Sequence, residues 1–249
     1  MRTMFAPKRF AIDTGAEVLA ADRLAADGCA SCLVLHGGAG TSDRSHWLVL
    51  RQNLARRGIG SVAVDFSGHG ESSARTPNSL SKRYREAVAA LQYLDEAEPR
   101  AVIGISMSGE IAVRLAAAPR NRITRLVTLV GAAYDSAAFE VPFGPAFTKI
   151  LRTPQSWRRS VVFEQIASFP GRLTVVRAAE DTVVPATIGE LLVANARRAE
   201  HAEIVDILNT DHALGLAFRA QPGLVDRLGN VICRAILARS MHFELNRVI

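Results

Sequence analysis

Apolar residues in this chain fall into short unbroken runs, separated by longer stretches in which apolar and charged positions mix. The runs are too short for helices and lack the polar alternation of a sheet with one wet face. They therefore predict strands of a parallel sheet buried on both faces. Ahead of them, residues 10–15 and 17–24 alternate loosely around Gly15 and predict an antiparallel hairpin that covers a sheet edge. The predicted buried strands are residues 31–35, 61–66, 101–105, 123–130, 173–178 and 203–208.

The mixed stretches predict amphipathic helices, because their apolar residues recur at helical spacing. Strands that alternate with helices in this way predict an α/β fold with helices on both faces of the sheet. The predicted helices are residues 45–57 (with Trp47, Leu50 and Leu54 on one face), 80–98 (with apolar positions at Tyr84, Val88, Leu91 and Leu94), 110–118, 186–198 and 221–239.

The alternation breaks between residues 131 and 170. This segment holds 7 of the chain's 15 aromatic residues, and prolines at 142, 145 and 154 keep any helix in it short. A long connection inside a compact domain is usually functional, so we expect a single domain, residues 1–249, with a lid of about residues 132–170 over the carboxyl edge of the sheet. The alternative is an excursion whose aromatic residues serve only its own core. With a lid, the substrate pocket would be lined by Trp47, Tyr134, Phe139, Phe143, Phe147 and Trp157.

Composition excludes several classes of protein. The chain has 249 residues, 49% of them apolar, and a net charge of +6. Its basic residues are nearly all arginines and are scattered, with no basic run interleaved with aromatics, so we expect no nucleic-acid partner. No stretch is apolar enough for a signal peptide or a membrane span. We therefore expect a soluble, cytoplasmic protein that does not bind membranes.

The three cysteines are too few for a disulfide framework. Cys29 and Cys32 have C-x-x-C spacing, but they enter a predicted strand, where residues three apart point to opposite faces. No second ligand pair for zinc is present. We interpret both cysteines as small buried residues and expect no metal site.

Candidate chemistry begins at Gly104-Ile105-Ser106-Met107-Ser108-Gly109, where a predicted strand meets a predicted helix. A turn this sharp needs small residues two positions before and after its centre, and Gly104 and Ser108 are small. This is the nucleophile-elbow pattern, which lifts a serine hydroxyl above the sheet beside the following amide, here that of Met107. The alternative is that small residues simply let the helix pack on the strand.

A second candidate is the glycine-rich loop His36-Gly37-Gly38-Ala39-Gly40, which follows the strand at residues 31–35. Such a loop lets backbone amides approach a phosphate or an oxyanion closely. The phosphate interpretation is weaker, because the loop lacks a G-K-[ST] ending and the G-x-G-x-x-G spacing.

A serine nucleophile needs a base, and the base needs an acid that fixes its tautomer. Among the histidines only His212 lies in a loop directly after the final strand, whereas His69, between two glycines, is better suited to fixing a tight loop. Asp181 and Asp135 both follow strands and could supply the acid. We favour Asp181, because the chain order Ser, Asp, His accompanies an elbow of this kind.

Together these motifs resemble the α/β-hydrolase superfamily over nearly the whole chain. The resemblance rests on the His36-Gly37-Gly38 loop, the segment D-F-S-G-H-G-E-S at residues 65–72, the elbow, E-D-T-V-V-P at 180–185 and the Asp211-His212 loop. It implies an eight-stranded, mostly parallel sheet with Ser106 as nucleophile, His212 as base and Asp181 as the acid. It also implies an oxyanion hole formed by the amides of Gly38 and Met107. Ser108 departs from the family pattern, which usually has glycine there, and the cap is short.

These parts predict acyl transfer without a metal or organic cofactor. Our leading hypothesis is hydrolysis of an ester or thioester of a small molecule with an apolar acyl part. The positive charge adds a weaker hypothesis, that the acyl group arrives on an acidic carrier such as a phosphopantetheine protein or coenzyme A. The alternatives are cleavage of a carbon-carbon bond, acyl transfer to an acceptor other than water, and a hydrolase fold that only binds its ligand.

Overall fold

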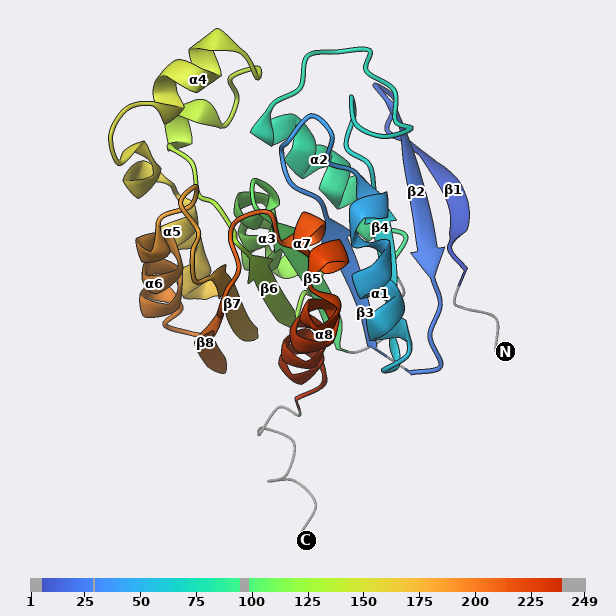
Figure 1. Ribbon diagram of the computed structural model, residues 1–249. Coiled ribbons are helices and arrows are strands. Elements are labelled where there is room, and N and C mark those ends of the chain that lie inside the picture. The colour runs from blue at the N-terminus through green and yellow to red at the C-terminus, as the bar shows by residue number, and fades with distance from the viewer. Residues whose placement is uncertain (1–5, 29, 95–98, 239–249) are drawn as a thin grey trace, which may run out of the picture.

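The computed structural model describes residues 6–28, 30–94 and 99–238 (Figure 1). Its strands are β1 Lys8–Asp13, β2 Val18–Leu24, β3 Ala30–Leu35, β4 Ile59–Val64, β5 Arg100–Ile105, β6 Arg125–Leu129, β7 Arg172–Ala178 and β8 His201–Ile207. They form one eight-stranded sheet in the order β1-β2-β4-β3-β5-β6-β7-β8. The β1–β2 hairpin is antiparallel and lies at one edge, β2 pairs antiparallel with β4, and all other neighbours are parallel.

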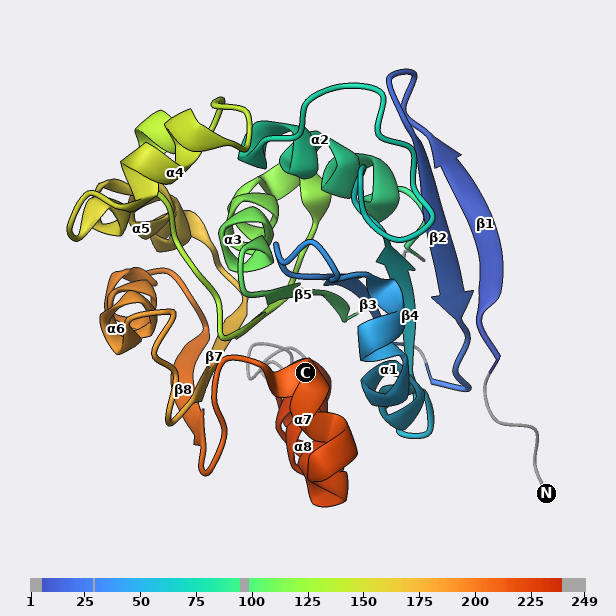
Figure 2. The same cartoon turned by 45° about the horizontal axis from the view of Figure 1, so that its top comes forward.

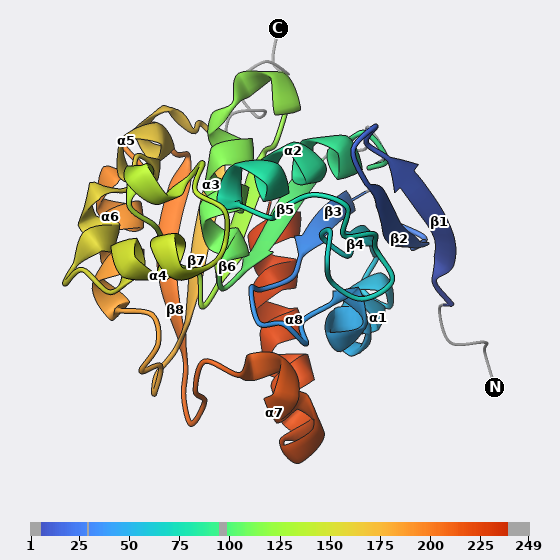
Figure 3. The same cartoon turned by 90° about the horizontal axis from the view of Figure 1, so that it is seen from above.

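Helices cover both faces of this sheet (Figure 3). The pair α1 and α8 packs on one face, while α2, α3 and α6 lie on the other (Figures 1 and 3). The helices are α1 Leu48–Ala55, α2 Leu80–Leu91, α3 Ser108–Ala117, α4 Pro145–Leu151, α5 Val162–Gln165, α6 Ala186–Asn195, α7 Leu214–Ala220 and α8 Pro222–Leu237, with 3-10 helices η1 Arg44–Trp47, η2 Pro119–Asn121, η3 Ser136–Ala138, η4 Ser156–Arg159 and η5 Ile166–Ser168.

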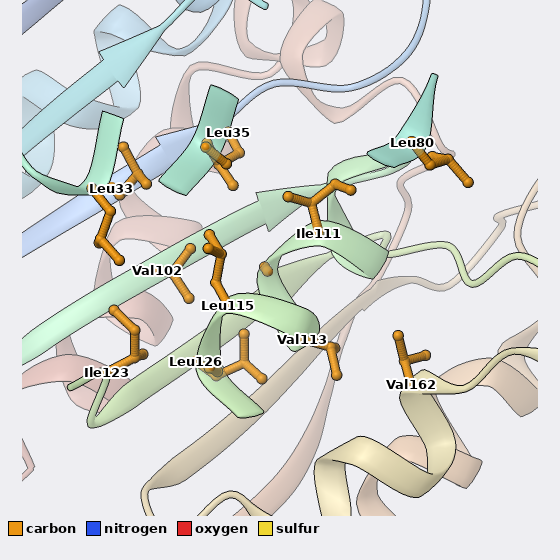
Figure 4. Close-up of a cluster of buried hydrophobic side chains, with 14 of the residues drawn as sticks. Leu33, Leu35, Leu80, Val102, Ile111, Val113, Leu115, Ile123, Leu126 and Val162 are labelled. Carbon is orange, nitrogen blue, oxygen red and sulfur yellow. The ribbon is translucent and has the colours of Figure 1, made fainter. Parts of the chain in front are cut away.

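The sheet divides the apolar interior into two cores. On one face, Leu33 and Val102 from the strands pack with Ile111 from α3 (Figure 4). On the other face, Val34 from β3 belongs to the same cluster as Leu54 from α1 and residues of α8. Successive residues of a strand point to opposite faces, so a strand between two cores must be apolar at every position. This requirement explains the unbroken apolar runs of the sequence.

The predicted strands and the opening hairpin are confirmed, with each bound of the six parallel strands within two residues of its predicted position. The helices differ more from the prediction. The first begins with the 3-10 turn η1, the second ends at Leu91, and α7 was not predicted. Residues 95–98 and 239, which the prediction placed at helix ends, lie outside the described residues.

Residues 131–170 contain the short helices expected from their prolines, namely η3, α4, η4, α5 and η5. The segment packs on α3 and α6 through α5, while α4 extends outward from the body of the molecule (Figure 2). Its function as a lid stays a prediction.

Candidate active site

Ser106 lies at a sharp turn between β5 and α3. Its φ of 51° falls in the left-handed region, which residues other than glycine rarely adopt. The turn leaves no space at Gly104, where a Cβ would lie 2.3 Å from the Ser108 carbonyl oxygen and 2.5 Å from the Cβ of Ala112. Simple packing of a helix on a strand requires no left-handed serine. The geometry is therefore that of an elbow that presents one hydroxyl at the carboxyl end of β5.

The structure brings Ser106, His212 and Asp181 together from the carboxyl ends of β5, β8 and β7. The Ser106 Oγ lies 2.9 Å from Nε2 of His212, and Nδ1 of His212 lies 2.9 Å from Oδ2 of Asp181. The other oxygen of Asp181 accepts the backbone N–H groups of Val183 and Val184 at 2.8 and 2.9 Å. A carboxylate can only accept hydrogen bonds, so Asp181 keeps the imidazole proton of His212 on Nδ1. Nε2 is then free to accept a hydrogen bond from the Ser106 hydroxyl. Because the carboxylate is fixed by two amides of its own loop, it also fixes the plane of the ring.

The glycine-rich loop after β3 lies directly beside this serine. A Cβ on Gly37 would lie 3.3 Å from the Ser106 Cβ and 3.8 Å from its Oγ, and a Cβ on Gly38 would lie 2.6 Å from the Cε of Met107. The backbone can approach the hydroxyl this closely because neither position carries a side chain. The N–H groups of Gly38 and Met107 donate to no other group among the described residues. Neither amide is therefore engaged by a group that a ligand would have to displace.

A family model described as "Alpha/beta hydrolase family" matches residues 32–173, which is more than half of the chain. The chain belongs to this family. The matched range includes the glycine-rich loop and the elbow, and the predicted fold, an α/β-hydrolase sheet of eight mostly parallel strands, is confirmed.

Solved structures with the same fold include several hydrolases. Est1E from Butyrivibrio proteoclasticus, with ferulic acid bound, is 18% identical with a TM-score of 0.69, and the match covers 92% of this chain and 100% of that chain. A serine hydrolase involved in carbazole degradation, the CarC enzyme, is 16% identical with a TM-score of 0.69 and coverage of 94% and 100%. The thioesterase domain from the curacin biosynthetic pathway is 16% identical with a TM-score of 0.68 and coverage of 91% and 99%. No curated protein matches the chain.

A cavity of about 190 Å³ opens beside Ser106 and His212 in this α/β hydrolase. One wall is the glycine-rich loop with Thr41 and Ser42, and the opposite walls come from η1 and α7. Among the six predicted pocket residues, Trp47 lines this cavity, and its ring packs edge-on against Phe218 with the centroids 5.6 Å apart. Ile105 also lines the cavity, and the wall residues that the sequence analysis did not single out include His46, Ala213, Leu214, Gly215 and Leu216.

The other five predicted pocket residues pack within the segment at 131–170 and against its neighbours. Phe147 is buried between Phe143 and Tyr134, with ring centroids 4.8 and 5.9 Å away. Phe139 lies under the guanidinium of Arg114, and the ring of Trp157 meets that of Phe163 edge-on. None of these five side chains lines the cavity beside Ser106.

A buried carboxylate ties this segment to the helix that follows the elbow. Glu110 in α3 accepts hydrogen bonds from the Ser160 hydroxyl at 2.8 Å, from the backbone N–H of Tyr134 at 3.1 Å and from Arg114. Burial raises the pKa of Glu110 above its ordinary value, although these donors oppose the shift. The aromatic residues are held in place by this anchor and by their own packing.

Asp135, the other candidate acid, is buried and serves a different partner. Its Oδ2 accepts from Nε of Arg159 at 2.8 Å, within the segment at 131–170, and its Oδ1 accepts from the N–H of Ala137. The choice of Asp181 over Asp135 therefore agrees with the observed hydrogen bonds.

Of the two cysteines that were interpreted as small buried residues, the structure describes Cys32. Cys32 is fully buried, and burial raises its pKa to about 12, while Cys29 lies outside the described ranges. Within those ranges, no group of three or more His, Cys, Asp or Glu residues could hold a metal ion. No helix there combines the length and apolar character that a membrane span needs.

Proposed function

We propose that this α/β hydrolase is a serine hydrolase that cleaves an ester or thioester through an acyl-enzyme. The observation that carries the proposal is the unbroken hydrogen-bond chain from the Ser106 hydroxyl through His212 to Asp181. A hydroxyl is a poor nucleophile at neutral pH, and this chain supplies both the base and the group that orients it.

In the proposed reaction, the Ser106 Oγ attacks the acyl carbon while its proton passes to Nε2 of His212. Asp181 remains ionised and stabilises the imidazolium. The Gly38 and Met107 amides hold the negative charge that develops on the acyl oxygen. The imidazolium then gives its proton to the departing alkoxide or thiolate, and an ester bond to Ser106 remains. Water, activated by the same imidazole, attacks this ester, releases the acid and restores the serine.

The size of the cavity suggests a compact acyl group. Pockets for drug-sized ligands have volumes of roughly 300–1,000 Å³, whereas the cavity beside Ser106 has about 190 Å³. Its apolar wall of Trp47, Leu214 and Leu216 suits a short chain or one aromatic ring. The net charge of +6 extends the proposal to acyl groups linked to an acidic carrier or coenzyme A.

A fluorophosphonate probe and a series of p-nitrophenyl esters test the proposal. We expect the probe to form one adduct, located on Ser106 by mass spectrometry, and kcat/KM to be highest for short or single-ring acyl groups. Product analysis with and without an added alcohol separates hydrolysis from acyl transfer. Absence of both labelling and turnover in folded protein would contradict the proposal.

The α7 wall should set the limit on acyl size. A Cβ on Gly215 would lie 3.5 Å from Cζ2 of Trp47, so a leucine at this position would extend into the cavity. For the Gly215→Leu variant we expect kcat/KM for the bulkiest accepted ester to fall about tenfold or more, with little change for the acetate. The matched control is Gly223→Leu, because Gly223 lies outside the cavity and a Cβ there meets no atom within 4 Å. An unchanged chain-length profile in Gly215→Leu would show that the acyl group binds elsewhere.

A further inference from the structure

A fully buried arginine lies behind the glycine-rich loop. Arg83 in α2 is 0% exposed, and it forms no ion pair with any described residue. Arg51, which is also fully buried among the residues that the structure describes, pairs with Asp22 at 2.6 Å. Burial lowers the pKa of Arg83 to about 10, which still leaves the guanidinium charged at neutral pH. The charge of Glu86, which is buried on the same helix, opposes this lowering of the pKa, but Glu86 makes no ion pair with Arg83. A buried cation without a paired carboxylate destabilises a fold, so its presence here calls for a reason.

The contacts of Arg83 point to the loop that carries the Gly38 amide. Its Nη1 donates to the Gly37 carbonyl oxygen at 3.1 Å, and its Nη2 donates to Nε2 of His69 at 2.5 Å. Its Cζ lies over the rings of Phe66 and Phe143, 4.8 and 5.5 Å from their centroids. Aromatic faces stabilise a cation but do not neutralise it. The charge therefore acts on the carbonyl group it touches.

Two imidazoles complete this network, and their hydrogen bonds fix their tautomers. Nε2 of His36 accepts from the Phe66 N–H at 3.0 Å, so its Nδ1 donates to the Gly37 oxygen at 2.8 Å. Nε2 of His69 accepts from Arg83, so its Nδ1 donates to the Ser42 carbonyl at 2.9 Å. Burial, with Arg83 as a further cause, lowers the pKa of both histidines, so both rings remain neutral.

The Gly37 oxygen consequently accepts two hydrogen bonds, one of them from a charged donor. This carbonyl belongs to the same peptide group as the Gly38 N–H. Hydrogen bonds at the oxygen of a peptide polarise its N–H and make it a stronger donor. In a trans peptide the two groups point in opposite directions, so the guanidinium holds the peptide from the side away from the N–H.

The departure from the family pattern at Ser108 adds one more restraint to the same loop. The Ser108 side chain is fully buried, and its Oγ donates to the His36 carbonyl oxygen at 2.5 Å. This hydrogen bond links the elbow to the glycine-rich loop at His36, the residue that precedes the Gly37–Gly38 peptide.

We propose that Arg83 is a positioning residue of the oxyanion hole, whose guanidinium orients and polarises the Gly37–Gly38 peptide so that the Gly38 amide binds the developing negative charge. The inference rests on the proposed function, because it assigns a role within the same reaction. It adds a residue that contacts neither the substrate nor the triad.

The variant Arg83→Met keeps an apolar stem and removes the charge and both donors. Loss of one oxyanion donor typically costs ~10²- to 10³-fold in rate, so we expect kcat to fall by up to this factor with little change in KM. Affinity for a trifluoromethyl ketone, which forms an oxyanion on Ser106, should fall in parallel. Affinity for the product acid should stay close to that of the wild type. Arg83→Lys keeps the charge but not the paired donors, so its kcat and its affinity for the ketone should lie between those of the wild type and those of Arg83→Met.

The matched control is Arg51→Met, since Arg51 is equally buried but binds Asp22 and Ser61 instead of the loop. Urea unfolding reports the stability of each variant. We expect Arg51→Met to lose stability yet keep the kcat of the folded enzyme. If Arg83→Met does not fold, Arg83→Lys decides by the same criteria.

A folded Arg83 variant with wild-type kcat and wild-type affinity for the ketone would overturn the inference. Equal losses of affinity for the ketone and for the product acid would also overturn it, because they would indicate general damage to the site. If turnover by the wild-type enzyme depends on Ser106, the proposed function is supported whatever the Arg83 variants do. The proposed function and the role of Arg83 can therefore fail separately.

Discussion

Replacement of Ser106 by alanine is expected to lower kcat on the order of 10⁵- to 10⁶-fold, as loss of a serine nucleophile does in other hydrolases with a triad. Alanine keeps the Cβ and meets the same backbone requirement at φ 51°, so the fold should be retained. The substitution removes only the Oγ and its hydrogen bond to His212. Turnover of the best p-nitrophenyl ester and urea unfolding measure the two effects.

His212→Ala provides an internal control for this result. Residues that act as one unit show non-additive losses, so the Ser106→Ala, His212→Ala double variant should be little slower than either single variant. Losses that multiply in the double variant would indicate that the two residues act independently. A Ser106→Ala variant that keeps its activity would remove the proposed nucleophile.

The sequence could predict the sheet because burial leaves a simple pattern. Strands β3 and β5 lie between two cores and carry one polar residue each, so their runs stand out. The candidate triad could be predicted for a related reason. In a parallel sheet, functional groups gather at the carboxyl ends of strands, and few residues with the required chemistry follow those ends.

The helix α2 shows what the sequence could not predict. The apolar positions Tyr84 and Val88 suggested its buried face, yet both are only half-buried, whereas Arg83 and Glu86 are buried. A charged side chain enters a core only when other elements supply partners, as Gly37 and His69 do for Arg83. Those partners are distant in sequence, so no local pattern reveals them. The buried face of α2 also carries Ser81, Lys82 and Glu86, so Arg83 does not stand out in the sequence as a single charge on an apolar face.

Apart from Trp47, the α7 and η1 walls of the cavity beside Ser106 were not predicted, for a similar reason. Its α7 wall comes from a short segment, Leu214–Ala220, whose glycine and length do not suggest a helix. The aromatic residues of 131–170 were the stronger signal in sequence, but much of their surface is covered by neighbouring rings and by arginines such as Arg114. The aromatic content of a segment predicts that its rings are buried. It does not predict whether they pack against the substrate cavity or against other parts of the protein, which depends on the tertiary structure.

Asp181→Asn is expected to lower kcat about 10⁴-fold, the loss seen when the acid of such a triad becomes an amide. The local hydrogen bonds specify why. Oδ1 of Asp181 accepts two backbone N–H groups, from Val183 and Val184, so an asparagine must place its own oxygen there. Its NH₂ group then faces Nδ1 of His212, and Nδ1 must accept a hydrogen bond from it. The imidazole proton moves to Nε2, where it prevents the ring from taking the proton of Ser106.

Asp135→Asn is the matched control, because Asp135 is a buried aspartate that follows β6, the strand after the elbow, and it pairs with Arg159 instead of His212. This variant should lose stability in urea unfolding and keep kcat close to that of the wild type. Asp181→Ala removes the carboxylate without adding an N–H group. It should therefore be less harmful to the imidazole tautomer than Asp181→Asn, because no donor then opposes the proton on Nδ1. If Asp135→Asn were the slower variant, the acid would have to be reassigned to the strand after the elbow, and the hydrogen bond between Asp181 and His212 would be only structural.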